Sequence, residues 1–283
     1  MFIDYHTHVG LESEHYGKAA EFIEQSKKMR NDEDVSMDVD PDTYHEAMEP
    51  VDKVIILAFR STLLGFNVTN DYVAEFAGKN PEKYIGFLSV DPHEAGYMEE
   101  LERAHFDLGL KGIKLSPLYQ GFHPTNERAM RIYSFAEKNG LPILMHQGAS
   151  FPREAPLKYA HPEMLEDIAI AFPDLRMILA HLGHPWEVET IVLIRKHPNL
   201  YSDLSGLYYR PWQFYNSLRL CQEYGVMHKL LFGSDYPVAT PNEAAAGLRN
   251  VNYFLEGTKF PRISVEDIEE IIHRDKLAEF GLQ

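Results

Sequence analysis

Two histidines separated by one residue, His6 and His8, end a β-rich N-terminal run, FIDYHTHVG. Alternate side chains of a strand point to the same face, so both imidazoles are expected side by side, with Asp4 one layer deeper. Adjacent imidazoles are an unusual core filling, whereas neutral imidazole is a common metal ligand. The spacing therefore predicts two ligands of a metal site. Asp4 either orients one of these imidazoles or makes a buried polar contact.

Three more polar residues follow apolar runs further along the chain. His146 follows PILM, His181 follows MILA and Asp235 follows LLFGS. Taken singly, each histidine has the alternative of a hydrogen-bonded rim histidine, and the aspartate that of a turn cap. Because all three occupy positions corresponding to that of the histidine pair, we interpret the five residues as one site.

Imidazoles with one carboxylate suit zinc, or another borderline divalent ion, with a position open for water. We expect one metal ion, zinc before manganese, with the ligands His6, His8, His146 and Asp235. A bound ion lowers the pKa of water to about 7, and a nearby carboxylate can take the proton as general base. Asp235 is assigned both tasks, weak ligand and base. His181 is predicted to polarise the oxygen of the substrate or transition state.

Eight β-rich runs alternate with helical patterns, as a (β/α)8 barrel requires. The runs are 2–9, 53–59, 83–90, 111–116, 141–148, 175–183, 200–206 and 229–237. The site of such a barrel lies at the carboxyl ends of its strands, where all five candidate residues fall. A doubly wound open sheet is the rival fold, but no GxGxxG loop follows a run. We predict an α/β fold, a distorted (β/α)8 TIM barrel.

The segments between the runs carry helix start and stop signals. Helices are predicted within 123–142, 184–199, 240–257 and 264–281, the last as an extra C-terminal helix. The polar stretch 10–50 is longer than a normal βα connection. It is interpreted as an insertion after the first strand, either a lid over the barrel mouth or a solvent loop.

Composition narrows the partners and the compartment. The 283 residues, 45% of them hydrophobic, suit one large α/β domain over 1–283. The net charge of -16 argues against nucleic acid and anionic membranes as partners, since both attract basic patches. One cysteine excludes an internal disulfide, and neither a signal peptide nor a membrane-length apolar run is visible. A cytoplasmic protein is expected.

At these residues the chain resembles the amidohydrolase superfamily, specifically the amidohydrolase-related branch that includes aminocarboxymuconate semialdehyde decarboxylase. The matching motifs are DYHTHVG (4–10), GLKGIKLSP (109–117), LPILMHQG (141–148), FPDLRMILAHLGHPW (172–186), NLYSDLSG (199–206) and KLLFGSDYP (229–237). The resemblance implies a distorted barrel with a divalent metal, usually zinc. It implies metal ligands at His6, His8, His146 and Asp235, and a catalytic histidine at His181.

Lys114, in the motif GIKLSP, leaves the metal count open. Several binuclear members of the superfamily carboxylate a lysine at this strand to bridge two metals. The alternatives are an ammonium that binds a substrate carboxylate and a structural ion pair. We prefer one metal.

The candidates for substrate binding lie in loops after the predicted strands. Arg60, Arg153 and Arg210 can each form a bidentate pair with a carboxylate, and each has a surface ion pair as its alternative. Trp186 is a candidate wall of the pocket, with packing as its alternative. A small polar or anionic substrate is therefore expected.

Three functions fit these residues. A metal-dependent hydrolase of a small amide, lactone or related carbonyl substrate needs the fewest assumptions, because the site activates water. A metal-dependent non-oxidative decarboxylase of a small unsaturated or aromatic acid is the alternative. A non-catalytic metal-binding barrel is the third. The resemblance also makes a homodimer plausible.

Overall fold

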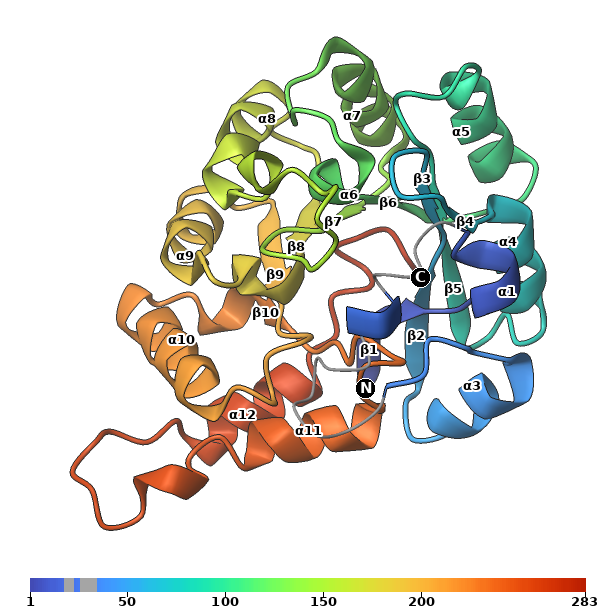
Figure 1. Ribbon diagram of the computed structural model, residues 1–283. Helices are drawn as coiled ribbons and strands as arrows, with labels where there is room; N and C mark the ends of the chain where they lie inside the picture. Colours follow the sequence, from blue (N-terminus) through green and yellow to red (C-terminus); the bar gives the residue numbers. More distant parts are fainter. Residues whose placement is uncertain (18–22, 26–34) are drawn as a thin grey trace.

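A computed structural model describes residues 1–17, 23–25 and 35–283, and it confirms the predicted (β/α)8 TIM barrel (Figure 1). Eight parallel strands form one sheet, each inside a predicted run: β1 (Ile3–His8), β2 (Lys53–Leu57), β5 (Tyr84–Ser89), β6 (Gly112–Leu115), β7 (Ile143–Met145), β8 (Met177–Leu179), β9 (Leu200–Asp203) and β10 (Leu230–Leu231). The chain after β10 closes the barrel against β1. Tyr5 N donates to Phe232 O at 3.0 Å, and Asp235 N donates to His6 O at 2.9 Å.

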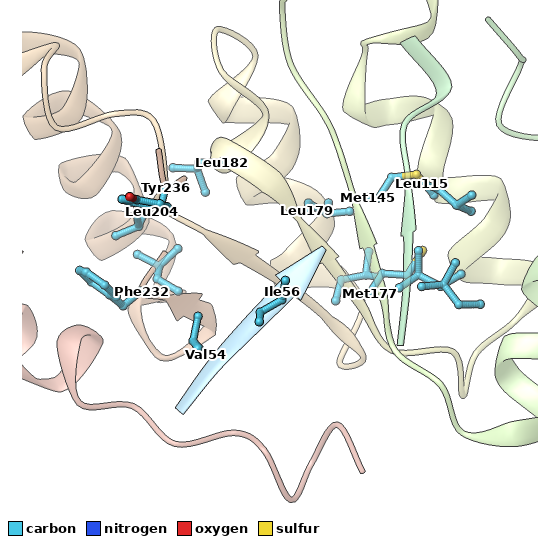
Figure 2. Close-up of a cluster of buried hydrophobic side chains, with 14 of the residues drawn as sticks. Val54, Ile56, Leu115, Met145, Met177, Leu179, Leu182, Leu204, Phe232 and Tyr236 are labelled. Carbon is cyan, nitrogen blue, oxygen red and sulfur yellow. The ribbon is translucent and has the colours of Figure 1, made fainter. Parts of the chain in front are cut away.

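Two apolar layers explain why these runs form a barrel. On β2, Ile55 and Leu57 belong to an inner cluster, whereas Val54 and Ile56 belong to an outer cluster beneath the helices. Figure 2 shows part of the outer cluster, with Val54 and Ile56 beside side chains from other strands. Strands buried on both faces read as continuous apolar runs, which is the pattern in the sequence.

Helices surround the sheet (Figure 1). They include α4 (Asn70–Gly78), α5 (Tyr97–Phe106), α6 (Pro117–Gln120), α7 (Glu127–Asn139), α8 (Glu166–Ala171), α9 (Glu187–Lys196), α10 (Pro211–Tyr224), α11 (Pro241–Arg249) and α12 (Val265–Ile272). The predicted helical segments contain α7, α9, α11 and α12. Local signals fix the start of α11, where Thr240 and Glu243 form a capping box.

The C-terminal prediction is wrong in extent, because α12 ends at Ile272 instead of continuing to 281. The chain beyond it packs Leu277, Phe280 and Leu282 into the inner cluster. It crosses the barrel in Figure 1, where it is drawn in red. The Tyr5 hydroxyl accepts a 2.8 Å hydrogen bond from Lys276 N. Burial of these apolar side chains outweighs the helical pattern.

The stretch between β1 and β2 holds α1 (Glu12–His15) and α3 (Pro41–Ala47). The rest of the predicted insertion lies partly at 18–22 and 26–34, outside the described residues. A hairpin of β3 (Phe59–Ser61) and β4 (Phe66–Val68), which the sequence analysis does not predict, follows β2. Its turn contains Gly65, at φ 78°, a conformation that glycine adopts without strain.

A bulge in β1 overturns the expected position of Asp4. Asp4 pairs with Val54 and Thr7 with Ile56, so three steps along β1 match two along β2. Asp4 therefore shares the outer face with Val54, while His8 pairs with Leu57 of the inner cluster. A strict alternation of two would have placed Asp4 beneath the histidines.

None of the helices in the described ranges is long and apolar enough to cross a membrane.

We predict that Gly112→Ala destabilises the barrel. A Cβ at Gly112 would lie 2.4–2.5 Å from ring atoms of Phe87, so the core must shift, at a cost of about 1–3 kcal/mol. Gly78→Ala is the matched control, since no atom of residues 1–17, 23–25 or 35–283 lies within 4 Å of a Cβ there. It should leave stability unchanged or raise it by about 0.4–1 kcal/mol. Urea unfolding measures both, and equal stabilities for the two variants would contradict the packing.

Candidate metal centre

Three of the predicted metal ligands meet at the end of β1. The Nε2 atoms of His6 and His8 lie 3.1 Å apart. Asp235 Oδ1 lies 3.4 Å from each of these two nitrogens. The bulge turns both imidazoles inward, and the backbone bond from Asp235 N to His6 O sets the carboxylate beside them.

Two more histidines complete the cluster. The ring of His181 stacks on that of His6, with centroids 4.9 Å apart, and the ring of His146 lies 5.0 Å from His181. His146 Nε2 is buried and has no hydrogen-bond partner among the described residues, which is costly unless another group binds there. The structure thus brings together all five residues that the sequence analysis selected.

The donor set fits a divalent metal. Ligand atoms of His6, His181 and Asp235 lie within 4.8 Å of one another, so His181 is also within reach of an ion. The nitrogen and carboxylate ligands suit zinc and related ions, and the unpartnered nitrogen of His146 offers a further donor. It remains a prediction that His181 acts in catalysis and does not bind the metal.

Left-handed backbone places two of these side chains. His181 has φ 58° and Asp235 has φ 59°, a region that residues other than glycine enter at a cost. At Gly206, φ 70°, a Cβ would lie 3.3 Å from His181 Nδ1, so only glycine fits beside the ring without crowding. Asp235 N donates to His6 O on β1, and His181 N donates to Asp203 Oδ1 on β9. These bonds hold the two residues in their strained conformation.

Sequence analysis missed Asp203 and Ser205, which lie at and after the end of β9. Asp203 Oδ2 lies 3.0 Å from His6 Nδ1, so Asp203 makes the orienting contact that the sequence suggests for Asp4. Ser205 Oγ lies 2.8 Å from His181 Nδ1. Two polar residues with one between them, as in SDLSG, repeat the pattern of the histidine pair, and that signal could have identified them.

Burial keeps the ligand imidazoles neutral. Burial, followed by a neighbouring ammonium, lowers the pKa of His6 to about 3. Burial also lowers the pKa of His8, and it lowers that of His146 well below the ordinary value. Burial opposes the charge of Asp235, but the imidazoles of His181 and His6 outweigh it and hold the pKa of this carboxyl well below its usual range. Neutral imidazoles and an ionised carboxylate are the forms that bind metal.

Lys114 lies inside the barrel beside the predicted ligands. Its Nζ is 3.2 Å from His6 Nε2, and no carboxylate oxygen lies within ion-pair range in the described part of the chain. The alternative of a structural ion pair therefore finds no partner there. Burial lowers the pKa of Lys114 to about 8, which eases loss of its proton. The ammonium and a metal would compete for the same lone pair of His6.

The other predicted substrate residues are scattered. Arg60 Nη2 pairs with Glu94 Oε1 at 2.7 Å, Arg153 is exposed, and the ring of Trp186 packs 4.1 Å from that of His161. None of these three lines the cavities beside the metal ligands. Arg210 does.

Two adjoining cavities open onto the cluster, and both are lined by Tyr119, His146, His181 and Asp235. We call the first the apolar lobe; its other walls include Val9, Tyr16, Met37, Phe59, Phe66 and Val68. We call the second the polar lobe; its other walls are Ala149, Phe151, His184, Gly206, Tyr209 and Arg210. Tyr16 and Met37 belong to the insertion after β1, so its described part contributes to the wall of the apolar lobe.

Comparison with known proteins finds a family match and several curated relatives. The family model described as Amidohydrolase matches residues 3–262. A curated dihydroorotase of Helicobacter pylori is 30% identical over 166 residues, which are 56% of this chain and 47% of that protein. The chain thus spans about half the length of the curated relatives it matches.

Solved structures share the fold over nearly all of the chain. A probable 2-pyrone-4,6-dicarboxylic acid hydrolase from Acinetobacter baumannii has a TM-score of 0.69 at 16% identity, covering 99% of this chain and 100% of that one. An amidohydrolase from Burkholderia multivorans with bound zinc has the same score and identity, covering 100% of both chains. A dihydroxybenzoic acid decarboxylase from Polaromonas with bound manganese has a TM-score of 0.67 at 17% identity, covering 99% and 96%.

We predict that Asp4→Asn flattens the dependence of stability on pH. Burial raises the pKa of the Asp4 carboxyl to about 7 from an ordinary 3.8. The folded state therefore favours the neutral acid: this stability is complete below about pH 4 and is lost as pH rises through 7. Asparagine keeps the acceptor for His6 N and Ser234 N and cannot ionise.

Urea unfolding with a chelator at pH 5 to 8 measures the difference. Relative to Asp4→Asn, the wild type should lose about 3 kcal/mol over this interval. Asp107→Asn, at an exposed position, is the control and should track the wild type. A constant offset between Asp4→Asn and the wild type would show that Asp4 does not titrate there.

Proposed function

This chain belongs to the amidohydrolase family, and on that premise we propose that it is a metal-dependent hydrolase of a small amide, lactone or related carbonyl substrate. One observation carries the proposal: Asp235 Oδ1 lies 3.4 Å from the Nε2 atoms of both His6 and His8, at the mouth of a cavity. A carboxylate beside neutral imidazoles is the arrangement that water activation requires.

His6, His8, His146 and Asp235 would hold the ion, with zinc preferred and manganese as the alternative. When bound, a divalent ion would act as a Lewis acid and lower the pKa of a bound water molecule. Bound zinc in the Burkholderia structure and bound manganese in the Polaromonas structure support these two choices. A second ion beside a carboxylated Lys114 is the less simple arrangement.

Asp235 is the proposed general base. Its lowered pKa keeps it ionised at neutral pH, ready to take a proton from water and return it to the leaving group. His181 Nδ1 lies 3.0 Å from Ser205 O, to which it can only donate. To polarise a substrate oxygen, its Nε2 must carry a second proton, so His181 acts in this role as the imidazolium. Both side chains line the two lobes.

The two lobes support a small anionic substrate with an apolar part. Arg210 Nη1 donates to Gly206 O at 2.8 Å, and this guanidinium forms no ion pair within the described residues. It can therefore receive a carboxylate in the polar lobe. Phe59, Phe66 and Val68 can cover an apolar group in the apolar lobe.

A non-oxidative decarboxylase is the second candidate. The cations Arg210 and Lys114 near the site can hold a carboxylate that is to be lost, and the Polaromonas neighbour is named a decarboxylase. The hydrolase remains preferred because Asp235 and the ligand imidazoles are sufficient for it without a carboxylated substrate.

We predict that activity depends on a bound metal ion. Small amides, lactones and unsaturated acids, each with and without a carboxylate, form the test panel. Dipicolinate should reduce turnover at least about 10²-fold, and zinc or manganese should restore it, because water activation requires the ion. Turnover indifferent to the chelator contradicts the mechanism.

The products distinguish the candidate functions. Uptake of ¹⁸O from water marks hydrolysis, whereas carbon dioxide release without uptake marks decarboxylation. Metal binding without any turnover favours a non-catalytic barrel.

Asp235→Asn should lower kcat by about 10²- to 10⁴-fold, because asparagine cannot take a proton. Circular dichroism and the unfolding midpoint check that the variant folds. Asp107→Asn, the same chemical change at an exposed position, should keep the wild-type kcat. A folded Asp235→Asn protein with wild-type kcat would remove Asp235 from the role of base.

A further inference from the structure

Asp203 lies where β9 ends, and both oxygens of its fully buried carboxylate are in use. Oδ2 contacts the ring of His6, and Oδ1 accepts hydrogen bonds from the backbone N–H groups of His181 and Ser205. One carboxylate therefore touches a predicted metal ligand and the backbone of the predicted catalytic histidine. His6 lies on β1, whereas His181 follows β8.

The contact of Oδ2 fixes the tautomer of His6. His6 Nδ1 is 3.0 Å from Asp203 Oδ2, and a carboxylate oxygen only accepts hydrogen bonds. The ring proton must then sit on Nδ1. Nε2 keeps its lone pair and points toward His8 Nε2 and Asp235 Oδ1, at 3.1 and 3.4 Å.

The contacts of Oδ1 fix the position of His181. Oδ1 accepts from His181 N at 3.1 Å, from Ser205 N at 3.0 Å and from Ser205 Oγ at 2.5 Å. The first bond holds the left-handed backbone of His181, φ 58°. The third turns the Ser205 hydroxyl so that its oxygen, 2.8 Å away, shares the proton of His181 Nδ1 with Ser205 O at 3.0 Å.

We infer that Asp203 is a positioning residue that sets the tautomer of His6 through Oδ2 and the placement of His181 through Oδ1. The consequence of the first contact for metal affinity rests on the proposed function; the tautomer itself does not. Ser205 is the intermediate between Asp203 and the ring of His181.

Asp203→Asn tests the first contact without changing the size of the side chain. Three donors face Oδ1, so the amide oxygen of asparagine must stay there. Its NH₂ group then replaces Oδ2 and donates to His6 Nδ1. The proton of His6 has to move to Nε2, which removes the lone pair that a metal needs. Loss of such a partner of a metal-binding histidine typically lowers metal affinity about 10- to 100-fold.

Two readouts on the full-length chain test the inference. Long-range ¹H–¹⁵N spectra of the chelator-treated protein, with the His6 signals assigned from their absence in His6→Gln, report which ring nitrogen carries the proton. We expect Nδ1–H in the wild type and Nε2–H in Asp203→Asn. Competition with a zinc-binding dye should show affinity about 10- to 100-fold weaker in the variant.

Ser205→Ala is the matched control, because it keeps Asp203 Oδ2 on His6 Nδ1 and removes a hydroxyl that lies 2.8 Å from His181 Nδ1 and 3.1 Å from His6 Nδ1. It should keep the Nδ1–H tautomer of His6 and bind zinc within about threefold of the wild type, while kcat falls. Nε2–H on wild-type His6, which is measured without any variant, overturns the inference. Wild-type zinc affinity in Asp203→Asn also overturns it. A wild-type chain with Nδ1–H on His6 that binds no metal would refute the proposed metal centre and leave the tautomer assignment standing.

Discussion

The hydrogen bond from Asp235 N to His6 O, 2.9 Å long, joins the chain after the last strand to the first strand of the barrel. Without this closure the carboxylate and the histidine pair, more than two hundred residues apart in sequence, would not meet. The same edge is completed by the bond from His8 N to Tyr236 O at 2.8 Å. Barrel closure and site assembly are therefore one event, because the backbone bonds that remove the sheet edges also align the ligands.

The site is assembled at an energetic cost that the rest of the fold offsets. It buries an ionised Asp203 and a lysine among neutral imidazoles, and it holds His181 and Asp235 in left-handed backbone. The apolar layers on both faces of the strands provide the compensating stability. Strain at the mouth of a barrel with a well-packed wall is typical of a site that is organised before its ligand binds.

The barrel and its main site residues could be predicted from sequence because their signals are local. Eight apolar runs separated by helices indicate the fold, and His146, His181 and Asp235 follow such runs directly. The position of Asp4 could not be predicted, because one extra residue in β1 shifts it to the opposite face. Arg60 was assigned to substrate from its loop alone, whereas its partner Glu94 lies 34 residues away and is visible only in three dimensions.

Crystals grown with zinc and measured on both sides of the zinc absorption edge test the central claim most directly. We expect one anomalous peak between His6, His8, His146 and Asp235, with zinc–nitrogen distances of about 2.0–2.1 Å. A structure at millimolar zinc with no anomalous peak among these four side chains would contradict the metal centre, and with it the proposed chemistry.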